Sequence, residues 1–139
     1  MSPITHYIVM FIMSMLSGML STMNVWVTRF SDIRISLNDI YMASLMTGWM
    51  FLFMGLVYQE TTTFIFGTIL TITSIVCIRT QYGVTQDEYI KGMIPHHSMA
   101  VHMSKRLLEK PNTINTFLQK IITGQNEDIE FMKRIQTPK

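Results

Sequence analysis

The sequence predicts an all-α membrane protein, in which three transmembrane helices precede an antiparallel hairpin of two helices. Two observations support this fold class. Residues 1–28, 40–59 and 61–78 contain no Asp, Glu, Lys or Arg, and each stretch is close to the roughly 20 apolar residues needed to cross a bilayer. Residues 85–135 instead carry apolar side chains at steps of three and four, which is the period of an amphipathic helix.

The three spans are expected near Tyr7–Val27, Ile40–Tyr58 and Thr62–Ile78, with aromatic residues marking several of their ends. Residues 1–80 would then form a membrane anchor and residues 81–139 a His- and Met-rich domain. The expected partner is the lipid bilayer. The formal net charge of +2 is too small to indicate binding to nucleic acid. The single cysteine, Cys77, excludes an intrachain disulfide and a metal site built from cysteines alone.

Small residues recur at helical spacing along the spans and predict close helix packing. They are Ser14, Gly18, Ser21, Ser44, Gly48, Gly67, Thr71 and Ser74. Methionine forms two ladders with steps of four, one containing Met42, Met46, Met50 and Met54 and the other Met15, Met19 and Met23. A thioether path for monovalent copper and flexible packing both fit this pattern. Packing is favoured, because no charged residue or helix break marks a transport route within the spans.

The order of three spans places the first loop and the C-terminal domain on the same side of the membrane. Arg29 and Arg34 lie in that loop, and Arg79 flanks the last span. The positive-inside rule therefore favours a cytoplasmic C-terminal domain.

The helix that follows the spans begins with a predicted capping box, Thr85 to Glu88. Two apolar stripes run beside each other along it. The first contains Tyr89, Met93, His96, Ala100, Met103 and Leu107, and the second contains Ile90, Ile94, His97, Val101 and Leu108. Together they predict one wide buried face that carries both adjacent histidines.

A break at residues 109–112 separates this helix from a second one. The seam of the second helix is expected to consist of Ile114, Leu118, Ile121, Gln125, Asp128, Met132 and Ile135. A turn centred near Lys110 would place His96 level with Gln125 and Met93 level with Asp128. The polar residues of the two helices would then meet.

The segment from Met93 to Met103 contains three histidines and three methionines, a ligand set that suits copper. We expect a metal site formed by His96 and His97 with Met93, Met99 and Met103. Gln125, Asp128 and Met132 are candidates to orient these ligands or to bind the metal themselves. Alternatively, the histidines donate hydrogen bonds to Asp128 and Gln125 and fix the register of the hairpin. His102 points away from the seam, and we expect it to be solvated.

The motif Met93-Ile94-Pro95-His96-His97 is followed by Ala100, Met103, Ile121-Ile122, Gln125, Asp128-Ile129 and Met132. Over about residues 86–135 this pattern resembles the small ferritin-like family of uncharacterised domains named for its Met-Ile-Pro-His-His signature. The resemblance implies a ferritin-like half-bundle and a link to copper binding and copper tolerance. It also implies an extracytoplasmic C-terminal domain on a bacterial-type cell membrane. This orientation is the opposite of the one that the positive-inside rule favours. Asp128 stands where the family usually has Glu, and its shorter side chain disfavours direct ligation.

Together these patterns predict a membrane-anchored protein that binds, buffers or confers tolerance to copper. The alternative is a structural or interaction module. A hairpin of about 50 residues is marginal alone, so a homo-oligomer, with two hairpins forming a four-helix bundle, is expected. A two-metal oxidase would require Glu-x-x-His motifs, which the sequence lacks. The sequence contains no nucleophile–base pattern, phosphate loop or cofactor fingerprint, so we expect no catalytic turnover.

Overall fold

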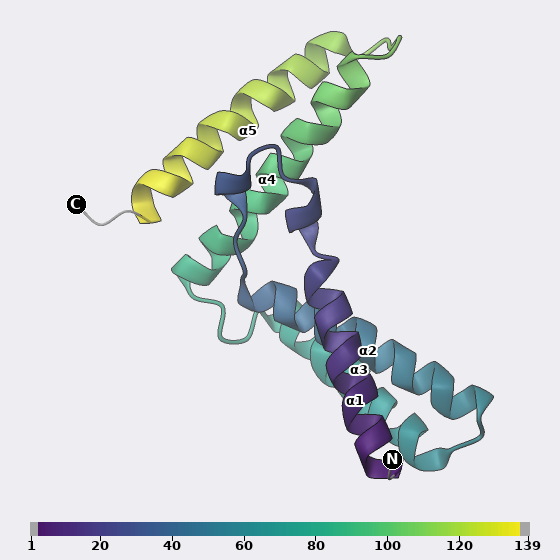
Figure 1. Ribbon diagram of the computed structural model, residues 1–139. Helices are drawn as coiled ribbons and strands as arrows, with labels where there is room; N and C mark the ends of the chain where they lie inside the picture. Colours follow the sequence, from purple (N-terminus) through teal and green to yellow (C-terminus); the bar gives the residue numbers. More distant parts are fainter. Residues whose placement is uncertain (1–2, 137–139) are drawn as a thin grey trace. The chain divides into compact units, whose positions relative to one another are not determined.

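The computed structural model describes residues 3–136, and these residues form helices without strands (Figure 1). The α-helices are α1 (Pro3–Leu20), α2 (Leu37–Val57), α3 (Thr61–Thr80), α4 (Gln86–Leu108) and α5 (Asn115–Gln136). Two short 3-10 helices, η1 (Met23–Trp26) and η2 (Phe30–Asp32), lie between α1 and α2. The described residues divide into two compact units, residues 3–22 with 37–84, and residues 23–36 with 85–136.

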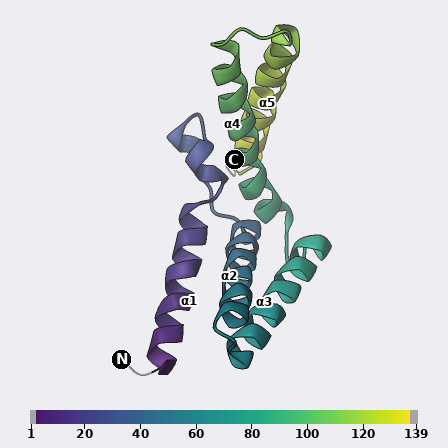
Figure 2. The same ribbon diagram turned by 90° about the vertical axis from the view of Figure 1, so that its right-hand side faces the viewer.

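The first unit contains α1, α2 and α3, and α2 packs against both of the other helices (Figure 2). Within residues 3–136, three segments are long and apolar enough to cross a membrane: Ile4–Trp26, Leu37–Val57 and Thr61–Thr80. The predicted spans are confirmed to this extent, with boundaries that differ by a few residues.

Small residues allow the helices of the first unit to approach closely. A Cβ atom added to Gly67 would lie 2.2 Å from the backbone nitrogen of Leu52, and one added to Gly18 would lie 2.8 Å from Ala43. These contacts confirm the predicted role of small residues in helix packing. Of the predicted set, Ser14, Gly18, Gly48, Gly67, Thr71 and Ser74 are buried, Ser44 is half-buried and Ser21 is exposed.

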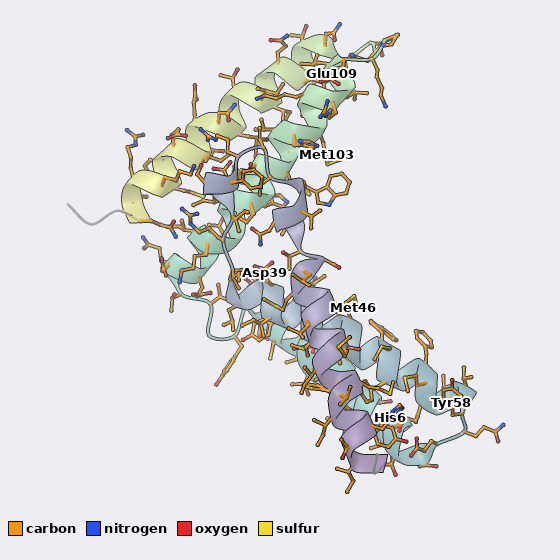
Figure 3. All side chains as sticks on the ribbon, viewed as in Figure 1. His6, Asp39, Met46, Tyr58, Met103 and Glu109 are labelled. Carbon is orange, nitrogen blue, oxygen red and sulfur yellow. The ribbon has the colours of Figure 1, made fainter. Side chains whose placement is uncertain are left out.

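Several methionines of the ladders take part in contacts between α1 and α2. Ser14 Oγ donates to Met50 Sδ at 2.9 Å, and Ser44 Oγ lies 3.8 Å from Met15 Sδ. An open groove of about 420 Å³ is lined by Met10, Met13, Ser14, Ser17, Met46 (labelled in Figure 3) and Met50. These thioethers pack and accept hydrogen bonds, and a copper path along them stays a prediction.

In the second unit, α4 and α5 lie side by side and run in opposite directions (Figures 1 and 2). The Thr85 side chain accepts a hydrogen bond from the Glu88 backbone N–H, which confirms the predicted cap of α4. The core between the two helices is apolar and consists of Ile90, Ile94, Ile129 and Met132, with Met93 packed against it.

The structure corrects the predicted buried face of α4. The second stripe is buried at Ile90, Ile94 and Val101, whereas Tyr89 and Met103 of the first stripe are 53% and 52% exposed. The stripes are one residue apart, which is about 100° around a helix. Both are apolar, and α5 covers the second stripe but reaches the first only near Met93.

Residues 23–36 pack on another side of α4, although the boundary predicted at residue 80 assigns them to the membrane anchor. The Thr28 backbone N–H donates to Ser98 Oγ at 2.8 Å, and Thr28 Oγ1 donates to the Ser98 carbonyl at 3.0 Å. Arg29 reaches α5, where its guanidinium lies 2.9 Å from Glu130 Oε1. This segment therefore forms a third part of the C-terminal unit.

Asp32 is the fully buried centre of this arrangement. Its carboxylate accepts a hydrogen bond from Ser98 Oγ at 2.7 Å and another from Lys133 Nζ, and Arg29 Nε lies 3.5 Å away. Burial raises the pKa of Asp32, but the hydrogen bonds from Lys133 and Ser98 and the nearby positive charges outweigh burial, so the pKa lies below its ordinary value. The ionised carboxylate thus stabilises the fold above the ordinary pKa of Asp, and this stability is lost as the pH falls through the lowered value.

Substituting Asp32→Asn should destabilise the protein, because Lys133 would lose the carboxylate that balances its charge. We expect a loss of about 3 kcal/mol or less, the lower end for breaking a buried ion pair, since Lys133 keeps some contact with water. Chemical unfolding of the full chain in detergent micelles measures the change. The exposed control Glu109→Gln should unfold like the parent, and an equal midpoint for Asp32→Asn would contradict this role.

Substituting Gly67→Ile should push α3 away from α2, because the new side chain would overlap the backbone at Leu52. Overpacking of this kind costs about 1–3 kcal/mol or more. The matched variant Thr73→Ile lies on the same helix at an exposed position and should be tolerated. Thermal unfolding in micelles compares the two variants, and similar midpoints would argue against a close α2–α3 contact.

Candidate metal site on helix α4

His97 lies where α4 meets α5. Its side chain is 13% exposed, and its Nδ1 atom is 3.3 Å from Asp128 Oδ2. The two atoms are not aligned for a hydrogen bond, and within residues 3–136 this buried nitrogen has no hydrogen-bond partner. Buried polar atoms usually have a partner, because leaving one unsatisfied costs about 1–3 kcal/mol. His97 Nδ1 is therefore a polar atom that requires an explanation.

The surroundings of His97 favour its neutral form. Burial lowers the pKa of His97 below its ordinary value, and the neighbouring His96 lowers it further, while Asp128 acts in the opposite direction. Imidazole must be neutral to bind a metal ion. His97 is thus prepared for ligation at neutral pH without first releasing a proton.

The structure corrects the expectation that both histidines lie on the buried face, because His96 is exposed. The two rings are in edge contact, with centroids 6.0 Å apart and planes at 62°. Consecutive residues of a helix do not share a face. When His97 turns toward α5, His96 is therefore directed to a different side of α4.

The three methionines of the predicted site lie in different surroundings. Met93 is half-buried and packs against the core, one turn from His97, and Met99 is half-buried. Met103 projects from α4 at the surface (Figure 3). There it borders an open cavity of about 470 Å³ lined by Trp26, His102, Met103, Ser104, Arg106, Leu107, Lys110 and Leu118.

The candidates on α5 are also separated by the fold. Asp128 is 57% exposed and faces His97, Gln125 is half-buried, and Met132 belongs to the apolar core. The predicted pairing of His96 with Gln125 is therefore replaced by the pairing of His97 with Asp128. At the other end of the helices, Gln136 Nε2 lies 3.5 Å from Asp87 Oδ1. The register differs from the prediction because residues 109–114 separate the helices, rather than a tight turn at Lys110.

Considering only residues 3–136, no three or more His, Cys, Asp or Glu side chains are grouped closely enough to hold a metal ion. The polar contacts of Asp32, Ser98 and Lys133 were not anticipated from the sequence. A charged residue in a short loop between two apolar spans is normally solvated, so the only signal for Asp32 was its position between Arg29 and Arg34.

Comparison with known proteins places α4 and α5 in a recognised domain. Residues 76–136 match the family described as Domain of unknown function (DUF305). The chain is also 41% identical over 135 residues to the "Uncharacterized protein L153" of Acanthamoeba polyphaga mimivirus. The alignment covers 92% of this chain and 89% of the relative. No solved structure matches the chain significantly.

The lowered pKa of His97 predicts a pH dependence of stability in the metal-free protein. The unfolded chain takes up a proton near pH 6.5, before folded His97 does, so the free energy of unfolding should fall as the pH drops below about 6.5. Denaturant titrations of the full chain with a chelator, between about pH 7.5 and 5.5, measure this. A His97→Gln variant should lose this part of the dependence and His102→Gln should retain it. Superimposable profiles for the parent and His97→Gln would contradict the prediction.

Proposed function

The chain belongs to the family of the mimivirus protein L153 and carries a DUF305 domain, and from this premise we propose that it is a membrane-anchored metal-binding protein. The proposed ligand is copper, held in the α4–α5 unit for buffering or tolerance, without catalytic turnover. One observation carries the proposal: His97 Nδ1 is buried and without a hydrogen-bond partner in the described chain, and burial lowers the pKa of this imidazole.

The donors near His97 suit copper better than a hard cation. An imidazole and the thioether of Met93, one turn away on α4, are borderline and soft ligands. Asp128 lies close enough to orient the His97 ring or to complete the ligand set. His96 and Met103 are exposed on α4 and Met99 is half-buried away from His97, so these three would serve as peripheral donors. In this proposal the protein provides the donor atoms and a partly buried site, and the metal ion binds to these donors.

A second candidate function is structural. The 3.3 Å contact between His97 and Asp128 would fix the register of α4 against α5, as polar residues in helical seams do. This function requires no metal. Since Asp128 is largely exposed, the net stabilisation from the pair would be small.

The membrane part of the proposal supports a role at a boundary between compartments. In the part of the chain that the structure describes, three helices are apolar enough to span a bilayer. We propose that the C-terminal unit lies on the extracytoplasmic side of a cell membrane, where it would meet incoming metal. The arginines of the first loop argue for the opposite side, so labelling an introduced surface cysteine in intact cells would decide the orientation.

Copper titration of the full chain tests the function directly. In detergent micelles, under reducing conditions and with a competing chelator, the parent should bind Cu(I). Substituting His97→Ala should abolish most of the affinity, and Asp128→Asn should weaken it about 10–100-fold, as expected for a residue that orients a metal ligand. His102→Ala, which removes an imidazole elsewhere on α4, should bind like the parent.

Equal and weak copper uptake by the parent and His97→Ala would reject the metal site. If His97→Ala also lowered the unfolding midpoint of the metal-free protein, the structural function would be favoured instead. A parent that binds copper through the spans alone would keep its affinity in His97→Ala and lose it when the exposed methionines Met42 and Met46 are replaced by leucine.

A further inference from the structure

One side of the α4–α5 pair is apolar and uncovered. On α4 it consists of the stripe that sequence patterns had placed in the core, with Tyr89, Met103 and Leu107 exposed and Met93 and Ala100 half-exposed. His96 lies in the middle of this stripe and is exposed. Large apolar patches on a soluble unit mark interaction sites.

A matching stripe runs along α5 with the same steps of four and three. Phe117, Phe131 and Ile135 are 59%, 57% and 45% exposed. Gly124 lies at the centre of the stripe, and a Cβ atom added to it would meet nothing within 4 Å. In order, the α5 stripe is Phe117, Ile121, Gly124, Asp128, Phe131 and Ile135.

The two stripes lie on the same side of the pair. Residues 23–36 contact α4 at Ser98 and α5 at Glu130 and Lys133. With 3.6 residues per turn, His96 is about 160° around α4 from Ser98, and Asp128 is about 160° around α5 from Glu130. Because the helices are antiparallel, these opposite sides form one continuous face, which at its Met103 and Leu107 end borders a cavity that Trp26 also lines.

The antiparallel register aligns the two stripes residue by residue. The contacts of His97 with Asp128 and of Asp87 with Gln136 show which residues of α4 and α5 lie at the same level. Large residues fall at both ends, small residues near the middle, and the polar residues fall at one level. The level pairs are Tyr89 with Ile135, Met93 with Phe131, His96 with Asp128, Ala100 with Gly124, Met103 with Ile121, and Leu107 with Phe117.

We propose that a second copy of this chain covers the face, so that two α4–α5 pairs form a four-helix bundle with His96 of each copy opposite Asp128 of the other. A two-fold axis parallel to the helices places α4 of one copy against α5 of the other, with the same level pairs as within one chain. Every neighbouring helix is then antiparallel, which is the common arrangement of four-helix bundles.

Charge complementarity favours a second copy over a lipid surface as the occupant. Asp128 is ionisable and lies in the centre of the face, where contact with hydrocarbon would remove its carboxylate from water at high cost. In the dimer, the imidazole of His96 from the other copy meets this carboxylate. Ala100 and Gly124 leave room for the helices to approach closely at the next level.

The dimer completes the candidate metal site, and this part of the inference rests on the proposed function. One chain offers a buried His97 beside Asp128 and directs His96 outward. A second copy brings its own His96 and Asp128 to the same level. The site would then lie at the centre of the bundle and contain donors from both copies.

Crosslinking between two differently tagged full-length chains tests the arrangement. In a Cys77→Ser background, one chain carries Ala100→Cys and the other Gly124→Cys, and both are produced together and treated in micelles with a short thiol-specific crosslinker. The expected product contains both tags. Either single variant produced alone should give little product. In this bundle α4 lies diagonal to α4 of the other copy, and α5 lies diagonal to α5.

Two matched controls define the face. Thr123→Cys, which is exposed on the other side of α5, should not crosslink to Ala100→Cys in the second chain. Adding Phe131→Glu should lower the two-tag yield at least about tenfold, the effect of about 1.4 kcal/mol, whereas Phe30→Glu on the exposed 3-10 segment should leave the yield unchanged. Circular dichroism confirms that both variants remain helical.

The possible outcomes separate the dimer from the metal function. Efficient product from Ala100→Cys alone would mean that α4 packs on α4, and absence of two-tag product would mean that no second copy covers the face; either result overturns the proposal. In the latter case, slower thiol labelling at position 100 in bilayer discs than in micelles would identify lipid as the occupant. Crosslinking without Cu(I) binding would reject only the proposed function, and Cu(I) binding without crosslinking would reject only the dimer.

Discussion

The buried carboxylate of Asp32 is the constraint on which the C-terminal unit depends. An ionised group can be removed from water only when charges and hydrogen bonds replace the lost hydration. Lys133 from α5 and Ser98 from α4 provide these interactions, while Asp32 itself lies between two membrane-competent helices. Three segments that are far apart in sequence therefore meet at a single buried side chain.

This constraint decides which part of α4 remains exposed. The helix has an apolar surface wider than one neighbour can cover, and its two stripes are similar in composition. Ser98 must face Asp32, so residues 23–36 occupy one side of α4 and α5 occupies the next. The stripe of α4 that contains His96 stays exposed, and so does the corresponding stripe of α5. An apolar face on only one side of a two-helix layer is thus a consequence of how the first loop is used.

Much of the fold could be predicted from the sequence because the signals are local. Charge-free stretches locate the spans, Thr85 and Glu88 locate the start of α4, and small residues such as Gly67 locate the close contacts in the first unit. The buried stripe of α4 could not be predicted, since both stripes have the same period and only the contact with residues 23–36 distinguishes them. That contact is between distant segments and depends on Asp32, whose sequence surroundings resemble an ordinary loop.

The candidate site was predictable in composition but not in geometry. Histidines and methionines at helical spacing identified the region. The predicted rotation of α4 about its own axis was wrong by about 100°, so that His97 faces α5 and His96 does not. The consequence is chemical, because the two imidazoles now differ in environment. His97 is desolvated next to a carboxylate and its pKa is lowered, whereas His96 keeps its contact with water. Desolvation makes an imidazole a better-prepared ligand but also makes an unsatisfied nitrogen costly, so His97 Nδ1 gains from any partner that reaches it. A metal ion would provide that partner, as would a rotation of Asp128 into hydrogen-bonding alignment, and the two alternatives compete for the same atom.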